Sequence, residues 1–133
     1  MNLRALLDQQ KWEEALAHLD AEHKRDEIRF PQDTNLPVMW HFGRGGVFLE
    51  MGEFQKCVDE WTCARERASD RLYELLLISA LEGQEEVVSA SALLSEFVCS
   101  DLNRMGQDRY WTHSTRRTKF KRLVDRICPE AET

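Results

Sequence analysis

The sequence predicts an all-α fold, and three observations support this prediction. Apolar residues recur three and four positions apart along most of the 133 residues, as they do in helices with one buried face. No segment shows the convincing period-two alternation of a half-buried strand. The 6 Gly and 3 Pro are too few for the turns of a many-stranded β-sandwich. Because the length is that of one ordinary domain, we expect residues 1–133 to form a single helical domain.

The first three helices are expected at residues 2–10, 11–29 and 37–51. Pro31 disfavours helical geometry at the residue before it, so the second helix should end there. Pro37 suits the first turn of the third helix, and Asn35 or Thr34 can provide its N-cap. Gly52 suits the left-handed conformation that stops a helix, so the third helix should end just before it.

Four further helices are expected at residues 54–69, 70–83, 85–105 and from 108 or 114 to 127. Asp70 can cap the helix at residues 70–83, and Gly83 should end that helix. Gly106 should break the next helix, and Pro129 should follow the end of the last one.

Three segments share one plan, in which a helix and a short turn lead to a second helix that opens with acidic residues. The turns fall at Gln9-Gln10, Met51-Gly52 and Glu82-Gly83, and the last two are 31 residues apart. Helical-hairpin repeats have a period of roughly 34 residues. We therefore expect three hairpins, a terminal basic helix and a short tail, at residues 2–34, 35–69, 70–105, 106–128 and 129–133.

The middle hairpin resembles a tetratricopeptide repeat. The small, large and turn residues of that pattern are met by Gly45, Phe48, Gly52, Phe54, Cys57, Trp61 and Ala64. The physical reason for such a pattern is that small residues let two helix backbones approach while large ones fill the space beside them. The resemblance covers residues 2–105 and implies an α-solenoid of stacked hairpins with a capping helix. Arg44 and Glu85 depart from the family pattern, because a leucine and an aromatic residue are usual at their positions.

The resemblance also implies a concave groove that binds a peptide or a helix. The residues that would face this groove are Met39, Phe42, Gly46, Leu49 and Glu50 in the middle hairpin and Tyr73 and Leu77 in the third. In the alternative interpretation, these side chains pack in the core or mediate self-association. The sequence thus predicts a non-enzymatic protein–protein interaction module, acting as an adaptor or as a chaperone-like holder.

Residues 104–122 carry a charge of +6, from seven Lys and Arg against Asp108, so the rest of the chain carries −12 to give the net −6. The basic patch expected here consists of Arg109, Arg116, Arg117, Lys119, Lys121 and Arg122. Such a segment is either a solvated helix face, a surface for an acidic protein or for a second copy of the chain, or a phosphate-binding surface with interleaved aromatic residues. A regulatory role in association with nucleic acid is therefore the alternative function.

No catalytic, metal or cofactor site is expected. No two histidines are spaced four apart, HExxH and CxxC are absent, and the glycines at Gly43, Gly45 and Gly46 lack the Lys-Ser/Thr and the preceding strand of a phosphate loop. The four cysteines are expected to be reduced thiols in packed positions. Because no signal-peptide pattern and no apolar stretch of about 20 residues is found, we expect a cytoplasmic protein without membrane contact.

Overall fold

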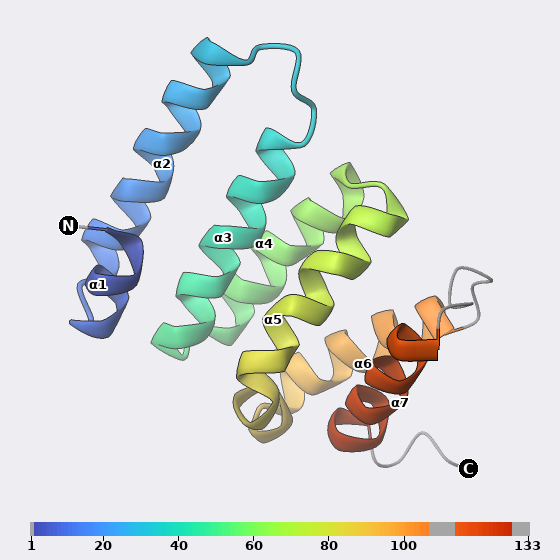
Figure 1. Cartoon of the computed structure of the whole chain (residues 1–133). Helices are drawn as coiled ribbons and strands as arrows, with labels where there is room; N and C mark the ends of the chain where they lie inside the picture. The colour runs from blue at the N-terminus through green and yellow to red at the C-terminus, as the bar shows by residue number, and fades with distance from the viewer. Residues whose placement is uncertain (1, 107–113, 129–133) are drawn as a thin grey trace. The chain divides into compact units, whose positions relative to one another are not determined.

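The computed structural model describes residues 2–106 and 114–128, and every regular element in these ranges is a helix (Figure 1). The helices are α1 (Leu3–Asp8), α2 (Trp12–Arg29), α3 (Leu36–Met51), α4 (Phe54–Arg67), α5 (Asp70–Ala90), α6 (Ala92–Gly106) and α7 (Ser114–Ile127). The all-α prediction is thus confirmed for the described residues. The chain divides into two compact units, Met1–Tyr73 and Glu74–Thr133, which we call the N-terminal and C-terminal units.

The helix ends in the N-terminal unit follow local chemistry. The side chain of Asn2 accepts a hydrogen bond from the backbone N–H of Ala5 at 2.9 Å and so caps α1. Gly52 ends α3 with a φ of 81°, as predicted. Asn35 precedes α3 without a side-chain capping bond, which differs from the expectation. Its backbone N–H instead donates to Asp33 Oδ1 at 2.9 Å, so the connector supplies its own turn.

The helix break predicted at Gly83 is present as a kink. The segment α5 is helical on both sides of Gln84, the residue after Gly83, whose backbone is non-helical (φ −129°, ψ 15°). The single helix predicted over residues 85–105 is wrong, because α5 ends at Ala90 and α6 begins at Ala92. Ser91 lies between the two helices, and its Oγ accepts a hydrogen bond from the backbone N–H of Leu94 at 3.2 Å. A serine that caps a helix in this way starts a new helix at a place that the apolar periodicity alone does not indicate.

Helices α3 and α4 pack closely at Gly45 of α3, which faces Trp61 of α4. The indole of Trp61 is fully buried, and a Cβ added at Gly45 would overlap it. The indole Nε1 donates to the backbone oxygen of Phe42 at 3.2 Å, and the two rings stack at 4.8 Å. Tyr73 meets the ring of Phe42 edge-on at 6.3 Å. The close approach predicted from the Gly45 and Trp61 pattern is present in the fold.

In the C-terminal unit, α6 and α7 lie side by side and are joined by a disulfide between Cys99 and Cys128. The expectation of four reduced thiols is therefore wrong for these two residues. Their Cα atoms are 5.7 Å apart, a normal separation for a disulfide. Cys57 and Cys63 are free thiols, as expected, and Cys57 is buried. Burial and the charge of Glu60 raise the pKa of the Cys57 thiol to about 12.

We predict that Gly45→Ala destabilises the protein and that Gly46→Ala does not. The new methyl group at Gly45 meets Trp61, so the free energy of unfolding should fall by about 1–3 kcal/mol. Gly46 is the matched control, because a Cβ there meets no atom within 4 Å. Alanine should raise the stability at that position by about 0.5–1 kcal/mol. Urea unfolding followed by circular dichroism measures both changes, and equal effects of the two substitutions would contradict the packing described.

We also predict that thiol reactivity separates the four cysteines. In native protein without reductant, near pH 8, Cys63 should react quickly with a thiol reagent, whereas Cys57 should react slowly because its high pKa keeps it protonated. Unfolding without reductant should expose two thiols, and reduction should expose all four. The Cys63→Ser variant is the control, since it should show no fast reaction. Four reactive thiols before reduction would overturn the disulfide assignment.

Candidate interaction surface

Four of the seven residues predicted to face a groove are buried, namely Phe42, Leu49, Tyr73 and Leu77. Gly46 is partly buried, and so is Glu50, which forms an ion pair with Arg4 of α1 at 3.0 Å. Met39 is 49% exposed. The four buried side chains thus agree with the core alternative that the sequence left open. Of the seven, Met39 offers apolar surface at the exterior.

Met39 belongs to an open pocket between the second half of α2 and the first half of α3. This pocket, which we call the α2–α3 pocket, has a volume of about 100 Å³. Its lining residues are Leu19, Glu22, His23, Asp26, Leu36, Met39 and Trp40. The lining therefore combines apolar side chains with two carboxylates and contains no Lys or Arg.

Trp40 forms a fixed wall of this pocket. Its indole Nε1 donates a hydrogen bond to Asp20 Oδ1 at 2.8 Å. The ring of His23 stacks on it at 4.5 Å with an angle of 4° between the planes. With one edge bonded and one face covered, the indole has few alternative rotamers. The pocket is therefore shaped before any ligand arrives.

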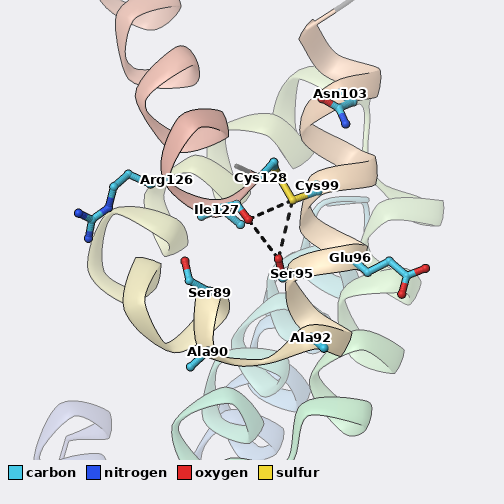
Figure 2. Close-up of a pocket in the computed structure, with 10 residues that line it drawn as sticks. All are labelled: Ser89, Ala90, Ala92, Ser95, Glu96, Cys99, Asn103, Arg126, Ile127 and Cys128. Atoms are coloured by element: carbon cyan, nitrogen blue, oxygen red, sulfur yellow. Dashed lines mark hydrogen bonds between the residues drawn. A yellow bond between two sulfur atoms is a disulfide. The ribbon is translucent and has the colours of Figure 1, made fainter. Parts of the chain in front are cut away.

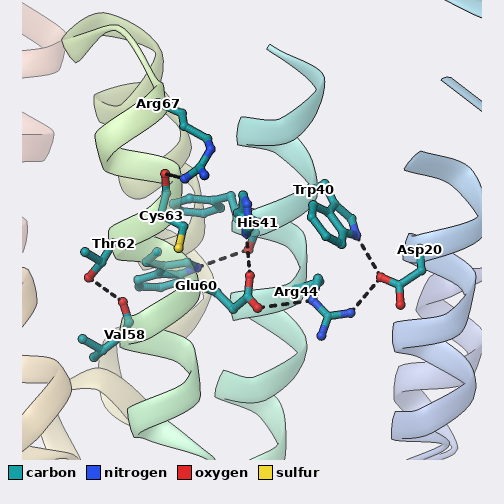
Figure 3. Close-up of polar contacts among 11 residues, drawn as sticks. Asp20, Trp40, His41, Arg44, Val58, Glu60, Thr62, Cys63 and Arg67 are labelled. Carbon is teal, nitrogen blue, oxygen red and sulfur yellow. Dashed lines mark hydrogen bonds and ion pairs between the residues drawn. The ribbon is translucent and has the colours of Figure 1, made fainter. Parts of the chain in front are cut away.

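A polar network connects the helices behind this wall (Figure 3). Arg44 donates to Asp20 of α2 at 2.7 Å and to Glu60 of α4 at 3.3 Å. His41 Nδ1 shares a hydrogen bond of 2.8 Å with the other oxygen of Glu60, and the carboxylate is the acceptor. Arg44, which departs from the tetratricopeptide pattern, is thus the residue that links α2, α3 and α4. That departure was the one signal of this network in the sequence, because its partners lie 24 and 16 positions away.

Two more apolar side chains are exposed at the same end of the α2–α3 hairpin, but they do not line the pocket. Ile28 is 84% exposed and Phe30 is 53% exposed. Ile28 follows Leu19 by nine positions, which is two and a half helical turns, so it projects from the opposite face of α2. Phe30 carries the guanidinium of Arg29 at 5.9 Å from its ring centre.

The described part of the basic patch is largely paired within the C-terminal unit. Lys119 binds Glu82 at 2.8 Å, and Arg122 lies 2.9 Å from Glu85. Arg126 is 3.5 Å from the same Glu85. The hydrogen bond from Lys119 lowers the pKa of the Glu82 carboxyl. Any stabilisation of the folded state by this pair is therefore present at neutral pH and is lost as the pH falls through that lowered pKa. Lys119, Arg122 and Arg126 of α7 thus meet acids of α5 in their own unit.

The remaining residues of the basic patch are Lys121, Arg109, Arg116 and Arg117. Lys121 is exposed. Arg109 lies outside the described residues, and so do the side chains of Arg116 and Arg117. Whether this patch binds a partner therefore stays a prediction.

A larger pocket of about 600 Å³ lies in the C-terminal unit, beside the disulfide (Figure 2). Its wall includes Cys99, Cys128 and Ser95, whose Oγ donates to the backbone oxygen of Ile127 at 3.1 Å. Figure 2 shows Glu96 and Arg126 directed away from each other on opposite sides. The two charged side chains of this pocket therefore do not converge on one point.

Comparisons with protein-family models, with curated proteins and with solved structures find no match to this chain. Of the helices in residues 2–106 and 114–128, none has both the length and the apolar character needed to cross a membrane. Within the same residues, no three His, Cys, Asp or Glu side chains are grouped so that they could hold a metal ion.

We predict that Glu85→Gln weakens the C-terminal unit more than Glu82→Gln. The carboxylate of Glu85 is 10% exposed and faces two arginines, whereas the side chains of Lys119 and Glu82 are 50% and 41% exposed. Loss of the Glu85 charge should lower the free energy of unfolding by about 1–2 kcal/mol. Loss of the Glu82 charge should leave it nearly unchanged. Urea unfolding of the two variants measures the difference, and a larger effect at Glu82 would contradict it.

Proposed function

We propose that the protein is a non-enzymatic interaction module that binds a helix or peptide of another protein, as an adaptor or a chaperone-like holder. The observation that carries this proposal is the α2–α3 pocket, which exposes Met39 beside the fixed indole of Trp40. Apolar surface of this kind, rimmed by charged groups, is typical of protein-binding sites. A helix placed on such a surface inserts side chains spaced three and four positions apart.

The proposal includes the tetratricopeptide-like arrangement, with hairpins that stack as an α-solenoid. The close contact of Gly45 with Trp61 and the sequential packing of α1, α2, α3 and α4 support it for the N-terminal unit. The groove proposed from the family resemblance shares Met39 with the α2–α3 pocket. Met39 is therefore the residue on which both versions of the site depend.

The cytoplasm is the proposed location, and the Cys99–Cys128 bond sets a condition on it. Disulfides persist in oxidising compartments and are uncommon among cytosolic proteins. The thiol count of freshly isolated protein decides the point. Two thiols in protein isolated without reductant, the number that the Cys99–Cys128 bond predicts, would count against the cytoplasm, and four thiols would fit it.

The binding function is tested with a displayed library of amphipathic helical peptides. We expect peptides selected on the wild-type protein to lose roughly tenfold or more in affinity for Met39→Glu, since a buried methionine contributes about 1.5–3 kcal/mol. Leu75→Glu is the matched control, because Leu75 is 45% exposed on α5 and lies outside the pocket. Circular dichroism verifies that both variants remain helical. The proposal is wrong if no peptide is enriched, or if the selected peptides bind Met39→Glu as tightly as wild type.

A further inference from the structure

Helix α1 covers only part of its neighbour α2. It has 6 residues against 18 in α2, and at about 1.5 Å per residue it is roughly a third as long. Figure 1 shows α1 beside the first part of α2. Its apolar side chains pack with Trp12, Ala15, Leu16 and Leu19 of α2 and with Val47 and Met51 of α3. Leu19 is the last residue of α2 in this apolar cluster with α1.

The α2–α3 pocket begins where the contacts of α1 end. Leu19 belongs both to the core under α1 and to the lining of the pocket. On α3, Met39 precedes Glu50 by 11 positions, or about three turns, so both project from the same edge. Glu50 is the residue that Arg4 of α1 contacts. On α2, Glu22 follows Ala15 by seven positions, or about two turns, and shares its edge.

These register relations place the pocket on the path that α1 would follow if it were longer. Helix α1 packs on the groove between the first half of α2 and the second half of α3. This groove continues between the second half of α2 and the first half of α3, where the pocket lies. There the same helix faces carry Leu19, Met39 and Trp40. A helix bound at this position would turn its apolar side chains towards α2 and α3, as α1 does with Leu3, Leu6 and Leu7.

Charge indicates the kind of helix that fits. Glu22 and Asp26 line the pocket on the α2 side, one helical turn apart, and no lysine or arginine lines it. A partner that places lysine or arginine opposite these carboxylates is favoured, and an acidic one is repelled. We propose that the α2–α3 pocket binds a basic amphipathic helix of a partner protein, which lies end to end with α1. This inference rests on the proposed function and names the chemistry of its partner.

A second copy of the chain is the less favoured occupant. Its helix α7 is basic and amphipathic, but Lys119, Arg122 and Arg126 are paired with Glu82 and Glu85 within their own unit. Binding α7 in the pocket of another molecule would require these pairs to break. A separate protein with an exposed basic helix carries no such cost.

The test uses two synthetic helical peptides with the same leucines at positions i and i+4, flanked by lysines in one and by glutamates in the other. We expect the lysine peptide to bind the wild-type chain at least tenfold more tightly at low salt and to shift the NMR signal of the Trp40 indole N–H. In the variant Glu22→Lys with Asp26→Lys, the preference should reverse. The control variant Glu13→Lys with Glu14→Lys makes the same charge change on the same helix, outside the pocket, and should keep the wild-type preference.

Three results would overturn the inference. The first is a glutamate peptide that binds the wild-type chain as tightly as the lysine peptide, and the second is lysine-peptide binding that leaves the Trp40 signal unmoved. The third is a wild-type dimer in sedimentation that the Glu22→Lys, Asp26→Lys variant abolishes, since a second copy would then be the occupant. Library peptides that depend on Met39 but carry no basic edge would refute this inference and leave the proposed function standing. If no peptide binds, both fail.

Discussion

The N-terminal unit depends on the contact between Trp61 and Gly45. A tryptophan can be buried at a helix–helix interface only where the facing helix leaves space for it, and Gly45 leaves that space. The indole N–H would be costly to bury without an acceptor, and the backbone oxygen of Phe42 supplies one. This contact sets the distance and the rotation of α3 against α4. It thereby fixes which edge of α3 is turned towards α2 and presents Met39.

Helix α2 is held by a different kind of interaction. Its first half has apolar cover from α1. Its second half is tied to α3 by Asp20, which accepts bonds from Trp40 and Arg44, and by the ring of His23, which stacks on Trp40. Asp20 and Arg44 are each partly exposed, so their pairing contributes more to orientation than to net stability. The result is a hairpin whose open end keeps a defined shape without being filled. Filling it with a partner therefore demands little reorganisation of this side of the interface.

The sequence predicts those parts of this molecule that depend on neighbouring residues. The helical periodicity, the stop at Gly52 and the space at Gly45 are all local patterns, and each is present in the fold. The break expected at Gly83 is present as the kink at Gln84, whereas the helix expected over residues 85–105 is divided at Ser91, because the side chain of that serine caps α6. The disulfide joins residues 29 positions apart, and no spacing rule identifies such a pair. The lining of the α2–α3 pocket combines two helices, so Glu22 and Asp26 could not be assigned to it before the register of α2 on α3 was known.

The two walls of the pocket differ in a way that bears on what it can select. Trp40 is held by Asp20 and His23, and the guanidinium of Arg44 lies 5.5 Å from its ring centre, so this wall is rigid. Met39 is unbranched and half exposed, so it can adapt to side chains of different shape. Apolar contact with such a surface discriminates weakly between one helix and another. Discrimination must then come from the carboxylates of Glu22 and Asp26, which favour a basic partner and speed its approach while adding less to its final affinity. The apolar walls of the pocket thus provide the binding of a helix, and the carboxylates of Glu22 and Asp26 provide its specificity for a basic one.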